Sequence, residues 1–232
     1  MKPPFLRCVV VSLLVVFLGL SSSLSQAEEK IALAGQGYGR REAESIINML
    51  FNRDLQSMPY EDVGEFLAAD DYGNFGMVVL AGLDAERGYT IEESEKIRNY
   101  VEKGGRLLLI RQAPKMFPDG AKGGFLFGPS FYVREGAECE VRQPDSPLLA
   151  GALEVGHPFW LQGNVFLKSL DWENLIGTDT YILVGERRLG QGKLYYLGSE
   201  LFRLLNESKS GQQGGVEGWV QILKNIFNDT AK

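Results

Sequence analysis

One stretch decides the fold of this chain: residues 75–111, FGMVVLAGLDAERGYTIEESEKIRNYVEKGGRLLLIR. Met77–Ala81 is a short apolar run between two glycines, which is typical of a strand buried on both faces. Leu107–Ile110 is a second run of this kind. The residues between the two runs have a helical pattern. A strand, a helix and a second strand form the parallel crossover unit of an open α/β sheet.

The helix of this unit has a recognisable start and end. Thr90 is followed three residues later by Glu93, the capping-box pattern in which each side chain accepts a hydrogen bond from a backbone N–H at the helix start. Gly104 and Gly105 end the helix, because glycine adopts the left-handed conformation found after helices at almost no cost. The expected buried side consists of Ile91, Ile97, Tyr100 and Val101.

The chain before this unit predicts a further strand and a further helix. Lys30–Ala34 is the first strand, residues 35–39 (GQGYG) are a turn, and Arg40–Arg53 is an amphipathic helix. The segment that follows is less regular. It predicts a weak strand near Met58–Val63 and a short helix at Glu65–Ala69.

The chain after this unit predicts a loop, a hairpin and a closing helix. Residues 112–131 are rich in glycine and proline and predict a long irregular loop, a kind of segment that is often functional. Thr180–Glu186 and Lys193–Leu197 flank a Gly-Gln-Gly sequence, which is a hairpin pattern. Apolar residues at helical spacing from Val216 to Phe227 predict an amphipathic C-terminal helix. Other short strands are expected at Phe131–Val133, Glu138–Val141, Phe159–Leu161 and Val165–Leu167, the first two as a small antiparallel addition.

The first 27 residues have the features of a secretory signal peptide. Lys2 and Arg7 precede the apolar run Cys8–Leu20, and small residues stand before the cleavage point expected after Ala27. The alternative is a retained membrane anchor, for which the apolar run is short. We expect an exported protein, periplasmic or extracellular, with residues 28–232 forming one domain and no membrane association after cleavage.

Composition excludes several classes of function. Cleavage removes two positive charges, so the net charge changes from −6 to −8, and the chain has no basic stripe. An acidic chain of this kind does not suit binding to nucleic acid or to an anionic membrane surface. Cys139 and His157 are the only Cys and His after residue 27, so a Cys/His zinc site is excluded. We expect no metal and no cofactor, and a buried, unreactive Cys139.

Several of these segments together carry a resemblance to a known family. The runs MVVLAG, TIEESEKIRNYVEKGGRLLLI and GQGKLYYLGSE, with the closing helix around Asn225, resemble a class I glutamine amidotransferase-like domain. The resemblance covers most of residues 28–232. It implies an α/β fold with an open, mostly parallel sheet flanked by helices, a flavodoxin-like three-layer sandwich. The most similar subset is the non-catalytic one of secreted and cell-envelope proteins.

The catalytic residues of that family are missing from the corresponding positions. Catalytic members have a Cys in a G-x-C-x-G elbow after the strand that matches Leu107–Ile110, whereas here residues 110–114 read Ile-Arg-Gln-Ala-Pro. A nucleophile elbow needs a small, strained turn above a helix N-terminus. Catalytic members also have a His-x-Glu pair after the late strand, where this chain has Gly198-Ser199-Glu200. The resemblance therefore implies a pseudoenzyme that does not hydrolyse glutamine.

Polar residues that follow the predicted strands form the candidate binding site. In an open α/β sheet, ligands bind in the crevice at the carboxyl ends of the strands. The alternative is that these residues are solvated loop and cap residues, with an Arg–Glu pair that holds the late strand. The candidate ligand-binding residues are Gln36, Tyr38, Arg40, Asp84, Arg111, Gln112, Ser199 and Glu200.

The Gly-Gln-Gly-Tyr-Gly turn does not have the dinucleotide-binding spacing G-x-G-x-x-G, because Arg40 stands where that motif has its third glycine. A tight turn is the interpretation we favour. Backbone N–H groups at the following helix could still bind an anion or a sugar hydroxyl, assisted by Arg40 or Arg41.

Two main hypotheses for function remain. The first is a non-catalytic binding or assembly module for a small molecule, a glycan or a protein partner. The second is a hydrolase, with carbohydrate as a candidate substrate, that uses Asp84, Glu200 and His157 as acid or base groups. A purely structural subunit is a third possibility. An aromatic set around the long loop could be a carbohydrate platform or a small core: Phe125, Phe127, Phe131, Tyr132 and Trp160.

Overall fold

The structure is a computed structural model. It describes residues 30–35, 37–51, 55–59, 75–81, 89–111, 113–118, 130–133, 139–152, 163–167, 171–198 and 217–229. Within these residues, no helix is long and apolar enough to cross a membrane.

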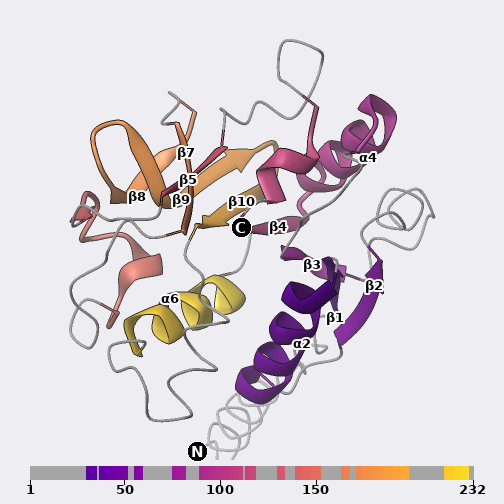
Figure 1. The fold of residues 1–232 in the computed structure, drawn as a ribbon, viewed down its shortest axis with the longest axis horizontal. Helices are drawn as coiled ribbons and strands as arrows, with labels where there is room; N and C mark the ends of the chain where they lie inside the picture. The colour runs from indigo at the N-terminus through magenta and orange to yellow at the C-terminus, as the bar shows by residue number, and fades with distance from the viewer. Residues whose placement is uncertain are drawn as a thin grey trace, which may run out of the picture.

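Ten strands of the described residues form one mixed sheet, in the order β2-β1-β3-β4-β10-β9-β7-β5, with β8 paired to β9 and β6 paired to β8 (Figure 1). The parallel part contains β2 (Leu55–Pro59), β1 (Lys30–Gly35), β3 (Phe75–Ala81), β4 (Arg106–Ile110) and β10 (Gly192–Leu197). The antiparallel part contains β9 (Tyr181–Leu189), β7 (Gly163–Leu167), β5 (Ser130–Val133), β8 (Glu173–Gly177) and β6 (Glu140–Val141). The predicted α/β fold with a mostly parallel central sheet is confirmed.

Three helices cover the two faces of this sheet. Alternate residues of each central strand point to opposite faces, so the sheet has two separate apolar cores. Helices α2 (Gly37–Phe51) and α6 (Glu217–Asn228) pack on the face that contains Val79 and Leu108. Helix α4 (Ile91–Glu102) packs on the face that contains Val78 and Leu107. The result is a three-layer arrangement with central strands buried on both sides.

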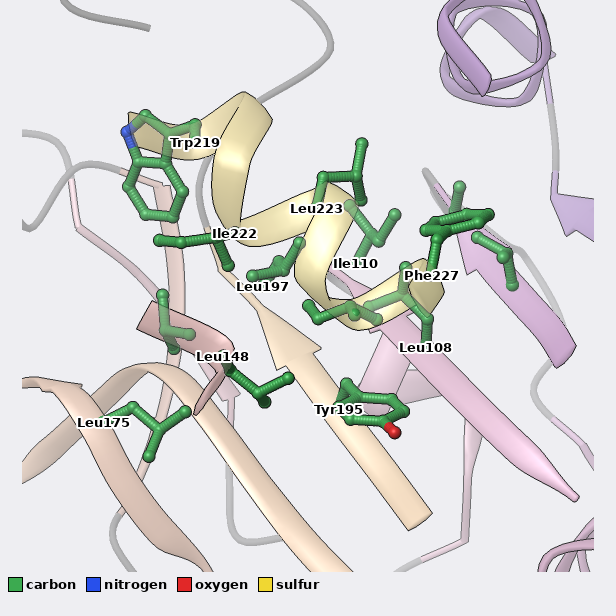
Figure 2. Close-up of a cluster of buried hydrophobic side chains, with 14 of the residues drawn as sticks. Leu108, Ile110, Leu148, Leu175, Tyr195, Leu197, Trp219, Ile222, Leu223 and Phe227 are labelled. Carbon is green, nitrogen blue, oxygen red and sulfur yellow. The ribbon is translucent and has the colours of Figure 1, made fainter. Parts of the chain in front are cut away.

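Helix α6 forms much of the first core. Figure 2 shows Trp219, Ile222, Leu223 and Phe227 of α6 above side chains of β4 and β10. The ring of Phe227 also stacks on Phe51 at the end of α2, with ring centroids 4.2 Å apart. The predicted amphipathic C-terminal helix is confirmed, and it contacts α2, the other helix on this face.

Helix α4 begins and ends as its sequence predicts. The Thr90 side chain accepts a hydrogen bond from the backbone N–H of Glu93, and the Glu93 carboxylate accepts one from the N–H of Thr90. Gly104 has φ 111°, and a Cβ at Gly105 would lie 2.4 Å from the ring of Tyr100. Only glycine fits both positions. The expected burial of Ile91 is wrong, because its side chain is 47% exposed at the first position of the helix.

Other element boundaries differ from the expectations. Helix α2 begins at Gly37, inside the segment predicted as a turn, and ends at Phe51. Strand β2 begins at Leu55, earlier than the predicted weak strand. Strand β8 was not predicted, and the antiparallel part is larger than a small addition. The predicted elements at Glu65–Ala69 and Phe159–Leu161 lie outside the described residues.

The amino ends of the central strands are joined to the end of α6 by buried polar groups. Arg106, which is 3% exposed, donates from Nε to the carbonyl of Gly76 and from Nη1 to the carbonyls of Ile226, Phe227 and Asp229. The Asp229 carboxylate accepts hydrogen bonds from Lys193 Nζ at 2.6 Å and from Tyr195 Oη at 2.8 Å. We call Arg106, Lys193, Tyr195 and Asp229 the α6 anchor.

Candidate functional site at the carboxyl edge of the parallel strands

The sheet contains a topological switch point between β1 and β3. The parallel strand order β2-β1-β3-β4-β10 is the doubly wound order in which the chain moves outward in both directions from two neighbouring strands. Helix α2 follows β1 on one face, and α4 precedes β4 on the other. Ligands of open α/β sheets bind at the carboxyl ends of the strands at such a point.

The carboxyl ends of four strands lie in one row. The parallel register pairs Gly35 with Ala81, Ala81 with Ile110, and Ile110 with Leu197. These strand ends form one edge of the sheet, and the candidate site residues follow them in the sequence. This edge is the candidate functional site.

Arg111 follows β4 at this edge and has an unusual backbone conformation. Its φ is 57°, and it is the one non-glycine residue with positive φ among the described residues. Two hydrogen bonds to β10 hold it: its N–H donates to the Leu197 carbonyl at 2.8 Å, and its carbonyl accepts from Tyr196 Oη at 3.1 Å. The chain therefore makes a sharp, fixed turn directly after β4, the position that the family resemblance assigns to the nucleophile elbow.

The segment after this turn differs from a catalytic elbow. Ala113–Met116 is a four-residue 3₁₀ helix that contains Pro114. The N–H of Tyr89 donates to the Met116 carbonyl at 2.6 Å, and the rings of Tyr89 and Phe117 lie 5.2 Å apart. This contact ties the segment before α4 to the segment after β4. A nucleophile elbow instead leads directly into a longer helix whose N-terminus lies under the nucleophile.

Arg40 is the second described arginine of the candidate site. It lies in the first turns of α2, and a Cβ added to Gly35 would be 3.2 Å from Arg40 Cβ. The Arg40 side chain is half-buried, and its buried Nε has no hydrogen-bond acceptor among the described residues. Arg41, the next residue, is exposed.

The remaining candidate residues are not described at the level of side chains. Tyr38 lies in α2, where only its backbone is described. The other predicted ligand-binding residues and the proposed hydrolase base lie outside the described residues: Gln36, Asp84, Gln112, Ser199, Glu200 and His157. Whether their side chains meet at the edge stays a prediction. The same holds for the aromatic set around the long loop, since Phe131 and Tyr132 are described only as backbone of β5 and the others are not described.

Other reactive or charged groups do not belong to the predicted site residues. Cys139 is buried just before β6, as expected, and burial raises the pKa of its thiol to about 11. Among the described residues, no group of three or more His, Cys, Asp or Glu side chains could hold a metal ion. The α6 anchor was not found from the sequence, because long stretches separate Arg106 and Asp229 from Lys193 and Tyr195, and the four residues form no local motif.

Buried charge also occurs on the antiparallel side of the sheet. Burial lowers the pKa of the Arg187 guanidinium, an effect opposed by Asp171, whose Oδ2 lies 3.4 Å from Arg187 Nη2. Burial raises the pKa of Glu186, which faces Lys193, Glu173 and Asp229. Burial and the hydrogen bond to Asp229 raise the pKa of Tyr195 far above its usual value, so this phenol stays protonated.

Several solved structures of other proteins have a similar fold. No protein-family model matches the sequence, and no curated protein matches it. Similar solved structures include a cytoplasmic protein from Salmonella typhimurium, with 15% identity and a TM-score of 0.55 over 84% of this chain and 98% of that one. A ThuA-like protein from Bacteroides uniformis has 13% identity and a TM-score of 0.53, over 86% of this chain and 90% of that one.

A glutamine amidotransferase from Thermotoga maritima is also similar in structure. It shares 11% identity with a TM-score of 0.52, over 88% of this chain and all of that one (100%). Identities at this level show a shared fold. The chain therefore has the fold of the class I glutamine amidotransferase-like and ThuA-like proteins.

Proposed function

We propose that this chain is an exported, non-catalytic domain that binds a ligand at the carboxyl edge of its parallel strands. The observation that carries the proposal is the turn at Arg111. A left-handed conformation costs an ordinary residue free energy, and such strain is typical of functional sites. The turn lies in the segment where the resemblance implies the nucleophile elbow, but that segment reads Ile-Arg-Gln-Ala-Pro and contains no cysteine.

The segment around Arg111 argues against amide hydrolysis. An arginine guanidinium has N–H donors and no acceptor, so it cannot act as a nucleophile. The following segment is a short 3₁₀ helix, so it lacks the helix that stabilises a developing negative charge in an elbow. An arginine at this edge suits recognition of a ligand better than attack on one.

A ligand screen tests the proposal. The full chain is expressed with export, and the purified protein is heated with a panel of metabolites and glycans. We expect one class of compound to raise the melting temperature. The response should disappear in Arg111→Asn, because asparagine tolerates the left-handed backbone but lacks the guanidinium. An unchanged response in this variant, or release of ammonia from glutamine by the wild-type protein, would contradict the proposal.

Export is tested on the same material. Mass spectrometry of the purified protein should give a chain that begins at Glu28, after cleavage at Ala27. Substitution of Ala27→Arg should block cleavage, since a signal peptidase requires a small residue there. A wild-type protein that retains residues 1–27 would contradict the export proposal and leave the binding proposal to its own test.

A further inference from the structure

We propose that Arg40 binds the anionic group, a carboxylate or a phosphate, of a ligand held at the switch point between β1 and β3. This inference rests on the proposed function and adds the chemical class of the ligand and the residue that anchors it. Three observations lead to it: the position of Arg40, its buried donor, and the close approach of β1 to β3.

The position of Arg40 follows from the fold. Strand β1 ends at Gly35, α2 begins at Gly37, and Arg40 lies against Gly35 on the first turns of that helix. Strands β1 and β3 are the two strands from which the parallel sheet extends in both directions. Arg40 is therefore the described cation nearest in sequence to the crevice that this topology creates.

Within the described part of the chain, no acceptor satisfies one donor of the Arg40 guanidinium. Its Nε is buried and has no hydrogen-bond acceptor. Glu44, one helical turn further along α2, is half-buried, yet the ion pairs formed within the described part of the chain do not join it to Arg40. A buried donor without an acceptor costs free energy, and a bound anion would supply the missing acceptor.

The surroundings of Arg40 favour a small anion. The first N–H groups of a helix have no partner within the helix, and the helix dipole adds positive potential at that end. A guanidinium binds a carboxylate or phosphate through two parallel hydrogen bonds. Gly35 keeps this corner narrow: a Cβ there would lie 2.1 Å from the Ala81 carbonyl oxygen, so a larger residue would push β1 and β3 apart.

A pair of variants tests the inference on the full exported protein. Arg40→Met and Arg41→Met each remove one guanidinium and keep an apolar stem, but Arg41 is exposed on the same helix. Binding of inorganic phosphate and of succinate is measured by calorimetry at low ionic strength, since salt screens such contacts. We expect Arg40→Met to weaken binding of at least one probe about ten-fold or more, and Arg41→Met to leave it nearly unchanged.

The two probes identify the source of the anion. Binding of phosphate alone indicates a phosphorylated ligand, and binding of succinate alone indicates a carboxylate. Stability without any anion provides a second readout. Arg40→Met should melt at the same temperature as the wild type or higher, because it removes an unsatisfied buried donor. A marked drop in melting temperature together with unchanged binding would show that Arg40 is structural and would overturn the inference.

Failure of this inference is distinguishable from failure of the proposed function. If neither anion binds, but a neutral ligand binds in a manner that depends on Arg111, the inference is wrong and the proposed function stands. If anion binding depends on Arg40 and no response depends on Arg111, the anion site stands and the role proposed for Arg111 is wrong.

Discussion

Arg111 shows how a single residue can report on a candidate site, most of whose predicted members lie outside the described residues. Its left-handed backbone is fixed by hydrogen bonds to Leu197 and from Tyr196. Both partners belong to β10, so the sheet itself maintains the turn. An unstrained loop would need no such support, which is why the conformation is a stronger indication of function than the arginine alone.

The strain at Arg111 predicts an unusual order of stability among variants. Arg111→Val should destabilise the protein by about 1–2 kcal/mol, because a β-branched residue is poorly accommodated at positive φ. Arg111→Gly should be close to neutral, since glycine relieves the strain but makes the unfolded chain more flexible. Urea denaturation measures both values.

Arg188 provides the matched control for Arg111. It is exposed in β9, in extended conformation, where valine is favourable and glycine is not. The order should therefore reverse, with Arg188→Gly less stable than Arg188→Val. The same order at both positions would show that φ at Arg111 carries no strain.

Glu186 makes the stability of the sheet depend on pH. Burial raises its pKa above 4.5, Glu173 and Asp229 raise it further, and Lys193 and Arg188 oppose the rise. An acid with a raised pKa holds its proton more tightly in the folded state, so its contribution to stability decreases as pH rises through the raised value. Glu186→Gln should therefore gain stability relative to the wild type between about pH 4 and about pH 8.

The pH prediction is checked by urea denaturation of both proteins across this range. Glu95 lies exposed on α4, and Glu95→Gln should leave the pH profile of the wild type unchanged. If Glu186→Gln instead loses stability relative to the wild type as pH rises, Lys193 dominates and ionised Glu186 stabilises the fold.

At the scale of elements, the α6 anchor explains how the last helix is fixed to the sheet. The final carbonyls of a helix have no partners within the helix. Arg106 of β4 donates to two of them, those of Ile226 and Phe227, to the carbonyl of Asp229 just after the helix, and to that of Gly76 in β3. Asp229 then binds Lys193 and Tyr195 of β10. Three neighbouring strands thus hold one helix end at the edge of the sheet opposite the candidate site.

Arg106→Met should be among the most destabilising changes away from the apolar cores. It keeps a stem of similar length but leaves several buried carbonyls without donors, at a cost of about 3 kcal/mol or more. Lys224→Met, at an exposed position of α6, should change stability little. Thermal and urea unfolding measure both variants. A loss below about 1 kcal/mol for Arg106→Met would mean that water replaces the guanidinium without cost.

The elements that could be predicted from the sequence are those with local chemical signals. Helix α4 has a capping box and a glycine pair, and the hairpin of β9 and β10 surrounds a Gly-Gln-Gly turn. Strand β8 has no such local signal. Its short sequence Glu-Asn-Leu-Ile-Gly forms a strand because it pairs with β9. The sequence did not predict the early start of α2, because its first residues, Gly-Tyr-Gly, have the pattern of a turn. Packing against β1 stabilises the helix there.

The position of the candidate site could be predicted from the sequence, but its backbone and side-chain geometry could not. The pattern of strands and helices indicates the carboxyl edge, and the register shows that the strands ending there form one row. The left-handed turn at Arg111 depends on hydrogen bonds to β10, which is distant in the sequence. The buried position of Arg40 Nε depends on how α2 packs against the end of β1. Such features arise from tertiary structure, so no local pattern encodes them.

At the scale of the whole molecule, the sheet is stable because both of its faces are buried. Val79 and Leu108 are fully buried neighbours in β3 and β4, on the face covered by α2 and α6. Neighbouring Val78 and Leu107 point into the other core, under α4. A charge introduced at either face therefore has no route to solvent and no partner, which costs several kcal/mol.

This burial predicts that Val79→Asp and Leu108→Asp each abolish folding. The expected cost is comparable to the whole stability of a domain, about 5–15 kcal/mol, once the lost apolar contacts are added to the buried charge. Soluble yield and cooperative thermal unfolding measure the outcome. Arg188→Asp, at an exposed position of β9 in the same sheet, should remain soluble and unfold cooperatively. Because β3 and β4 also hold the row of strand ends at the carboxyl edge, a soluble and cooperative Val79→Asp protein would contradict both their central position and the site built upon them.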